Sequence, residues 1–253
     1  MALDAEGYIA VPPVTAFQPA FQAIVDDTIH QLRLTVGDDL HSLWLYGSVA
    51  FGTAVEGQSD LDVCFVFRHP LAPATRDSLA AVKERLTARH PVVSKIDVDK
   101  GTLSEVMDPN NLNTWGYWLK HHCRCLYGED LSVRFNRFRP SKALARALNG
   151  DFTKVLDEYV AKLSCALPGR QQWQRAAARK VIRSTNMLRQ DSDADWPATL
   201  AEHVSRFVLR YPDQEAAIAF FLAESYQPGA SAREFISQLD AFRGWLVQQL
   251  EQS

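Results

Sequence analysis

The sequence predicts an α+β protein in which a mixed sheet flanked by helices precedes an all-α helical bundle. Before residue 140, short apolar runs rich in β-branched and aromatic residues alternate with segments of helical periodicity. After that point every periodic segment is helical, and proline or glycine separates one segment from the next. We therefore expect two domains, residues 1–140 and 141–253, each of ordinary domain size.

The first domain is expected to begin with a helix and to continue with alternating strands and helices. Gly37 is placed to end the first helix, because glycine readily adopts the left-handed conformation that closes many helices. Pro91 opens a β-branched run that reads as the third strand. The expected helices cover residues 16–36, 74–90 and 111–120, and the expected strands cover 41–47, 60–67, 91–99 and 122–128.

The second domain is expected to contain helices alone. Ser231 and Glu234 have the spacing of a capping box, which marks the start of the last helix. The expected helical segments cover residues 141–167, 170–190, 196–210, 213–226 and 231–250.

Composition narrows the class of function. The chain carries 27 Lys and Arg against 30 Asp and Glu, a net charge of -3, whereas proteins that coat nucleic acid present a basic surface. The acidic excess falls within residues 1–140, which hold 17 acidic and 13 basic residues.

The 4 cysteines do not suggest a disulfide framework. The first residues lack the basic region of a signal peptide, and no apolar run is long enough to span a bilayer. We expect a cytoplasmic protein with no membrane partner.

Residues 45–63, LYGSVAFGTAVEGQSDLDV, carry the most informative pattern. One strand ends at Gly47 and Ser48, and the next opens with Asp60 and Asp62. Residues two apart on a strand share a face, so these two carboxylates repel unless a cation lies between them. Mg²⁺ binds carboxylates together with substrate phosphates. A glycine followed by a serine offers a phosphate an open backbone N–H and a hydroxyl donor.

A third carboxylate is available on the strand expected over residues 91–99. Asp97 and Asp99 share one face, and either can complete the group if this strand lies beside the one that carries Asp60 and Asp62. Asp97 is preferred because apolar residues flank it on both sides. Two metal ions held by three carboxylates would align a hydroxyl with the α-phosphate of a nucleotide.

These residues resemble the signature of the DNA polymerase beta-type nucleotidyltransferase superfamily. The pattern is Gly47-Ser48, then Asp60-Leu61-Asp62-Val63, then the triplet Ile96-Asp97-Val98, and the resemblance covers residues 41–100 closely. Leu126-Tyr127-Gly128 is similar to the segment that closes the catalytic domain in small bacterial members. With a helical domain after it, the chain resembles the antibiotic (aminoglycoside-type) adenylyltransferases.

The resemblance implies roles for the site residues. Asp60 and Asp62 would bind both Mg²⁺ ions, and Asp97 would be a further ligand or the base that takes the acceptor proton. Gly47 and Ser48 would contact the terminal phosphates of a nucleoside triphosphate, expected to be ATP. Ser59 is a further expected contact to the nucleotide.

Segment 170–190 adds basic candidates. Arg175, Arg179 and Arg183 stack on one helix face with no acid in the segment, so an anion nearby would relieve their repulsion. In family relatives a helix at this point reaches back to the triphosphate, which makes Lys180 and Arg183 the candidates for phosphate contacts. A solvated face or a set of interdomain ion pairs explains the basic residues equally well. Trp115, Tyr117 and Trp118 have helical spacing, which favours core packing over stacking on a nucleobase or acceptor.

The sequence thus predicts a Mg²⁺-dependent nucleotidyltransferase that moves AMP from ATP to a hydroxyl of a small molecule, such as an aminoglycoside-like antibiotic. An acidic first domain suits a cationic acceptor. Two alternatives stay open: transfer to RNA, tRNA or a protein, and a degenerate nucleotide-binding partner protein. The intact carboxylates count against the last, because like charges held together without a metal cost stability.

Overall fold

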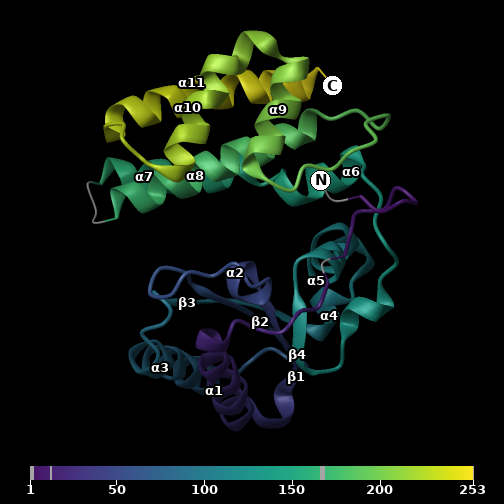
Figure 1. Ribbon diagram of the computed structural model, residues 1–253, viewed down its shortest axis with the longest axis vertical. Helices are drawn as coiled ribbons and strands as arrows, with labels where there is room; N and C mark the ends of the chain where they lie inside the picture. The colour runs from purple at the N-terminus through teal and green to yellow at the C-terminus, as the bar shows by residue number, and fades with distance from the viewer. Residues whose placement is uncertain (1–2, 12, 166–168, 253) are drawn as a thin grey trace. The chain divides into compact units, whose positions relative to one another are not determined.

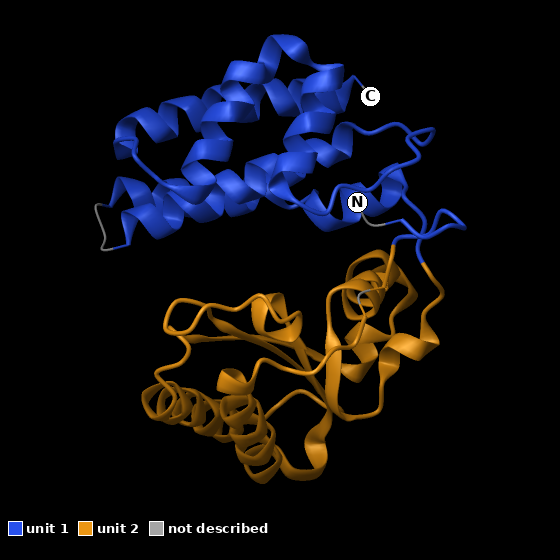
Figure 2. Cartoon of the chain, viewed as in Figure 1, with its two compact units in different colours: residues 1–9, 138–253 blue, residues 10–137 orange. Residues whose placement is uncertain are grey.

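A computed structural model describes residues 3–11, 13–165 and 169–252 of the chain. They form two compact units, residues 10–137 and residues 1–9 with 138–253 (Figure 2). The N-terminal segment joins the second unit because the Ile9 N–H donates to the Phe138 carbonyl at 2.8 Å and the Arg139 guanidinium lies over the Tyr8 ring. Each unit has its own hydrophobic core.

A four-stranded mixed sheet forms the centre of the first unit, in the order β3-β2-β1-β4. β1 runs antiparallel to β2 and β4, whereas β2 runs parallel to β3. The strands are β1 Leu40–Tyr46, β2 Leu61–Phe67, β3 Ile96–Thr102 and β4 Arg124–Gly128. This sheet, followed by helices alone, confirms the predicted α+β class.

Two long helices, α1 (Pro19–Val36) and α3 (Pro73–Arg89), pack against each other and on the sheet (Figure 1). α1 buries Phe21, Ile24 and Leu32 at helical spacing. Short helices fill the connections: α2 Gly47–Ala50, α4 Leu103–Val106 and α5 Tyr117–His121, with η1 Gly37–Asp39, η2 Pro109–Asn111, η3 Leu112–Gly116 and η4 Leu131–Arg134.

One strand of this unit differs from the prediction. The third strand begins at Ile96 rather than at residue 91, because the backbone before it bonds to the loop that precedes β2. The Gly57 N–H donates to the Val92 carbonyl at 2.8 Å, and the Ser94 N–H donates to the Ser59 carbonyl at 3.0 Å. The helix expected over residues 111–120 is present, and its first part, η3, is π-helical and runs directly into α5.

The named elements of the second unit are all helices among its described residues, and their core is centred on phenylalanine and leucine side chains. The single segment expected over residues 141–167 is two helices, which part at Gly150, a poor helix former. The Ser231 hydroxyl accepts a hydrogen bond from the Glu234 N–H, as the capping motif predicts. The helices are α6 Lys142–Asn149, α7 Phe152–Ser164, α8 Arg170–Ser184, η5 Thr185–Leu188, α9 Leu200–Arg210, η6 Pro212–Gln214, α10 Glu215–Tyr226 and α11 Ala232–Glu251.

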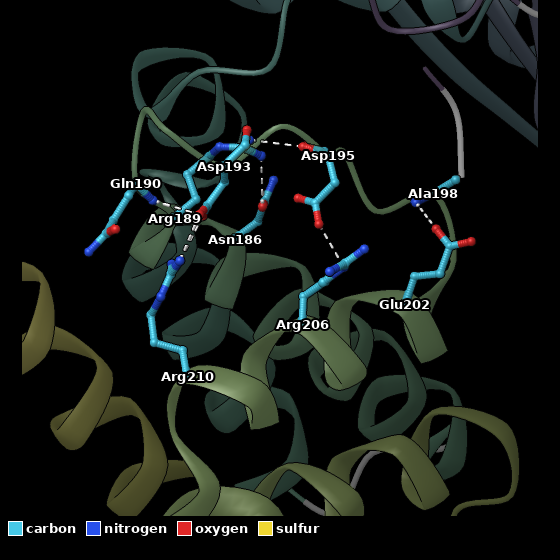
Figure 3. Close-up of polar contacts among 9 residues, drawn as sticks. All are labelled: Asn186, Arg189, Gln190, Asp193, Asp195, Ala198, Glu202, Arg206 and Arg210. Carbon is cyan, nitrogen blue, oxygen red and sulfur yellow. Dashed lines mark hydrogen bonds and ion pairs between the residues drawn. The ribbon is translucent and has the colours of Figure 1, made fainter. Parts of the chain in front are cut away.

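The loop between η5 and α9 is held by arginines (Figure 3). Arg210 binds both carboxylate oxygens of Asp193, at 2.8 and 2.9 Å, and Arg206 pairs with Asp195 at 2.6 Å. Arg189 donates to the backbone carbonyls of both aspartates. Among the described residues, no helix is long and apolar enough to cross a membrane.

Candidate active site

Three aspartates meet at one end of β2 and β3. Asp62 and Asp97 lie opposite each other in the parallel register of these strands, and Asp60 precedes β2 by one residue. Side chains two residues apart on a strand share a face, so Asp60 projects toward the same side as Asp62. One carboxylate oxygen from each of the three lies within 4.8 Å of the others. The structure therefore brings together Asp60, Asp62 and Asp97, which the sequence singled out.

Gly47 lies directly against this acidic group. β1 pairs with β2 so that Tyr46 is opposite Asp62, and Gly47 follows with a φ of +71°. A Cβ atom at Gly47 would come within 2.0 Å of Asp62 Oδ2. Only glycine permits both the positive φ and this close approach. The next residue, the half-buried Ser48, sits in the first turn of α2, and its carbonyl accepts from the Thr53 N–H at 3.0 Å.

Asp62 carries the strongest electrostatic perturbation among the three carboxylates. Burial raises its pKa to about 6, and the charges of Asp60 and Asp97 add to the shift. Both effects disfavour a charged carboxylate that has no cation beside it. At neutral pH the group thus holds more negative charge than its surroundings compensate.

A lysine that the motif does not mark partly compensates that charge. Lys95 Nζ contacts Asp97 Oδ2 and lies 3.4 Å from Asp60 Oδ2. Burial lowers the pKa of Lys95, but its hydrogen bond and charge interaction with Asp97, together with Asp60, outweigh that effect and raise it. The Ser94 hydroxyl also donates to Asp60. Sequence analysis missed both residues; one available signal was that Lys95 precedes Asp97 by two positions.

The donor set fits a divalent cation. Three carboxylates supply hard oxygen ligands of the kind that Mg²⁺ prefers. Burial, and after it the repulsion from Asp60 and Asp97, raises the pKa of Asp62, and such an ion would neutralise the negative charge that both effects oppose. The ammonium of Lys95 already occupies part of this role beside Asp60 and Asp97.

Asp99, the alternative third carboxylate, has a different partner. It lies two pairs further along β3, opposite Cys64, and accepts a hydrogen bond from the Tyr46 hydroxyl. The Tyr46 ring packs edge-on against Trp118 with centroids 5.0 Å apart, and Trp118 lies 5.3 Å from Trp115. Trp115 and Trp118 therefore form a half-exposed aromatic cluster with Tyr46, which binds Asp99. The third aromatic residue noted in the sequence, Tyr117, is buried.

The three remaining candidates, Ser59, Lys180 and Arg183, have different surroundings. The Ser59 hydroxyl accepts from the Val55 N–H at 2.9 Å, which closes the loop before β2. In the second unit, Lys180 of α8 pairs with Asp151 at 2.6 Å. Arg183, on the same helix, is exposed and has no carboxylate partner among the described residues.

Comparisons with known proteins agree with the site. Residues 32–106 match the family described as nucleotidyltransferase domain, a range that contains Gly47 and the three aspartates. Comparison with curated proteins gives no significant match. The chain therefore carries a nucleotidyltransferase domain, and it is an enzyme of the class that transfers nucleotidyl groups.

The fold is similar to that of spectinomycin adenyltransferase AAD(9) from Enterococcus faecialis, whose crystal structure contains ATP and spectinomycin. The TM-score is 0.57 at 12% sequence identity, over 90% of this chain and 98% of that chain. The similarity extends through both the sheet unit and the helical unit, as the predicted resemblance to aminoglycoside-type adenylyltransferases implies.

Proposed function

We propose that this protein is a Mg²⁺-dependent adenylyltransferase that moves AMP from ATP to a hydroxyl of a small molecule. The observation that carries the proposal is the group Asp60, Asp62 and Asp97 packed against Gly47, within a matched nucleotidyltransferase domain. The similar fold of an enzyme crystallised with ATP and spectinomycin supports an adenine nucleotide and an aminoglycoside-like acceptor.

In the proposed reaction the acceptor hydroxyl attacks the α-phosphorus of ATP, and pyrophosphate leaves. Asp60 and Asp62, with Asp97 as the third ligand, would hold two Mg²⁺ ions, which neutralise charge on the phosphates. Gly47 leaves the backbone open, and Ser48 offers a hydroxyl to the terminal phosphates. Asp97, if it is not a ligand, would accept the proton of the attacking hydroxyl. Lys180 and Arg183 are proposed phosphate contacts, and Ser59 a nucleotide contact, by resemblance.

An acceptor screen tests the proposal. The full chain with Mg²⁺ is incubated with each of the four α-labelled nucleoside triphosphates and with aminoglycoside and aminocyclitol antibiotics, bulk tRNA, or no acceptor. We expect pyrophosphate release and label on an antibiotic, with ATP as donor. Label on tRNA or on the protein would establish the macromolecular alternative instead. Absence of pyrophosphate release with every pair would contradict the proposal.

The affinity for Mg²⁺ should rise with pH through about 6. Burial and the neighbouring carboxylates raise the pKa of Asp62 to about 6, so below pH 6 a metal ion must displace a proton from the folded protein. Over the same window the contribution of Asp62 to the stability of the metal-free fold falls as pH rises, because the folded state binds a proton at this carboxylate that the unfolded chain has released. The measurement is Tm with and without Mg²⁺ from pH 5 to 7.5.

We expect the Mg²⁺-induced rise in Tm to grow across this range in the wild-type protein. In Asp62→Asn, which has no proton to displace at this position, the rise should be smaller and flatter with pH. A Mg²⁺ effect of equal size at pH 5 and pH 7.5 in the wild type would refute the assignment of Asp62 as a ligand.

A further inference from the structure

The face of the sheet opposite the aspartates contains a cavity of about 180 Å³ beneath α1 and α3. Alternate residues of the same two strands point to opposite faces. Val63 on β2 and Val98 on β3 line the cavity, whereas Asp62 and Asp97, their neighbours, belong to the acidic group. The cavity is therefore a separate site that shares β2 and β3 with the candidate active site.

The charges around this cavity are all of one sign. Its walls are apolar side chains of α1, α3, β2 and β3, and its charged lining residues are Arg76, Lys83 and Lys100, with no acid among the described residues that line it. None of these three cations has an ion pair or a side-chain hydrogen bond within the described part of the chain, whereas Arg89 and Lys95 each have a carboxylate partner. Unpaired cations beside a low-dielectric wall create a positive potential that attracts an anion.

A second hollow of about 310 Å³ lies beside the cavity. Arg76 and Lys100 line both spaces, so the two cations stand between them. Glu105 is the acid lining the second hollow, and its carboxylate is already bound by the Thr102 N–H at 2.7 Å. The two cations are therefore placed to receive the charged end of a ligand whose apolar part lies in the cavity.

We propose that this cavity binds a small amphipathic anion, a carboxylate attached to an alkyl chain or ring of six to ten carbons. A cavity of roughly 150 Å³ accommodates a benzene-sized group, which sets the size of the apolar part. Burial of that part supplies affinity, and Arg76 and Lys100 provide charge-assisted hydrogen bonds to the carboxylate. This proposal does not depend on the nucleotidyl transfer proposed above, because ligand binding at the cavity can be measured without catalysis.

The test uses octanoate as the probe on the full chain, with octan-1-ol and octylammonium as probes of equal tail length. Binding is followed by calorimetry and by Tm below the micellar concentration of each compound. We expect octanoate to bind saturably and to raise Tm, and the alcohol and the ammonium compound to bind about tenfold more weakly or worse. Equal binding of all three, or no saturable binding of octanoate, would overturn the proposal.

Three variants localise the binding. Ala80→Trp places a large ring at an exposed position of α3 that lines the cavity, so octanoate binding should be lost while the fold persists. Lys100→Gln should weaken octanoate about tenfold without changing octan-1-ol binding. Lys154→Gln, at an exposed lysine of α7 in the other unit, is the matched control and should bind octanoate as the wild type does. Octanoate binding that survives both Ala80→Trp and Lys100→Gln would refute the site.

Discussion

Asp62→Asn should abolish nucleotidyl transfer and, at the same time, make the metal-free protein more stable. Asp62 is half-buried, and its charged form is opposed by burial and by the charges of Asp60 and Asp97. An amide keeps the shape of the side chain but supplies no charge to a metal ion. The loss of several kcal/mol of transition-state stabilisation corresponds to a fall in kcat of at least about a thousandfold.

Asp62→Asn should raise the stability of the metal-free protein although it removes activity, because the carboxylates of the acidic group repel one another. At pH 7 the Asp62 carboxylate is above its raised pKa of about 6 and is therefore ionised at a cost that asparagine does not carry. We expect a higher Tm for Asp62→Asn without metal and a smaller gain in Tm on addition of Mg²⁺. Pyrophosphate release and thermal melting of the same preparation measure both effects.

Asp99→Asn is the matched control. Asp99 also lies on β3, but its carboxylate accepts from the Tyr46 hydroxyl and is outside the three-carboxylate group. An asparagine at this position can still accept that hydrogen bond, so activity should change by less than about tenfold. If Asp99→Asn were inactive and Asp97→Asn active, the third carboxylate would be Asp99 and the assignment made from the structure would be wrong.

The acidic group could be predicted from the sequence because its geometry follows from local rules. Asp60 and Asp62 are two apart at the start of an apolar strand, which fixes their common face whatever the rest of the fold does. The choice between Asp97 and Asp99 depended on strand register, which sets Asp97 opposite Asp62 and Asp99 opposite Cys64. Register arises from long-range pairing, so the sequence alone left both residues open.

The features that escaped prediction depend on contacts between segments far apart in the chain. Lys95 was missed because its role depends on a contact with Asp60, which precedes β2, as well as with Asp97. The expected strand start at residue 91 was wrong because Val92 and Ser94 bond to the loop before β2 rather than to a sheet partner. The apolar cavity depends on how α3 packs over β2 and β3, and no periodicity in α3 reveals it.

Gly47→Ala should remove activity by displacing Asp62, although it changes only one hydrogen into a methyl group. At φ +71° an alanine costs about 1–2 kcal/mol of stability from backbone strain. Its Cβ would also lie 2.0 Å from Asp62 Oδ2, so the carboxylate or the β1–α2 turn must move. A misplacement of about 1 Å at a reacting centre lowers the rate by about a hundredfold, which is the loss of kcat that we expect.

Gly52→Ala separates strain from displacement, because Gly52 has nearly the same φ, +70°, in the loop that follows α2. Nothing lies within 4 Å of the Cβ that this substitution would add. Both variants should therefore lose stability by a similar backbone cost, measured by urea unfolding, whereas only Gly47→Ala should lose pyrophosphate release. Full activity of both variants would mean that the contact between Gly47 and Asp62 does not position the catalytic carboxylate. Full loss of activity in both would indicate that the strained turn, rather than the carboxylate, controls the reaction.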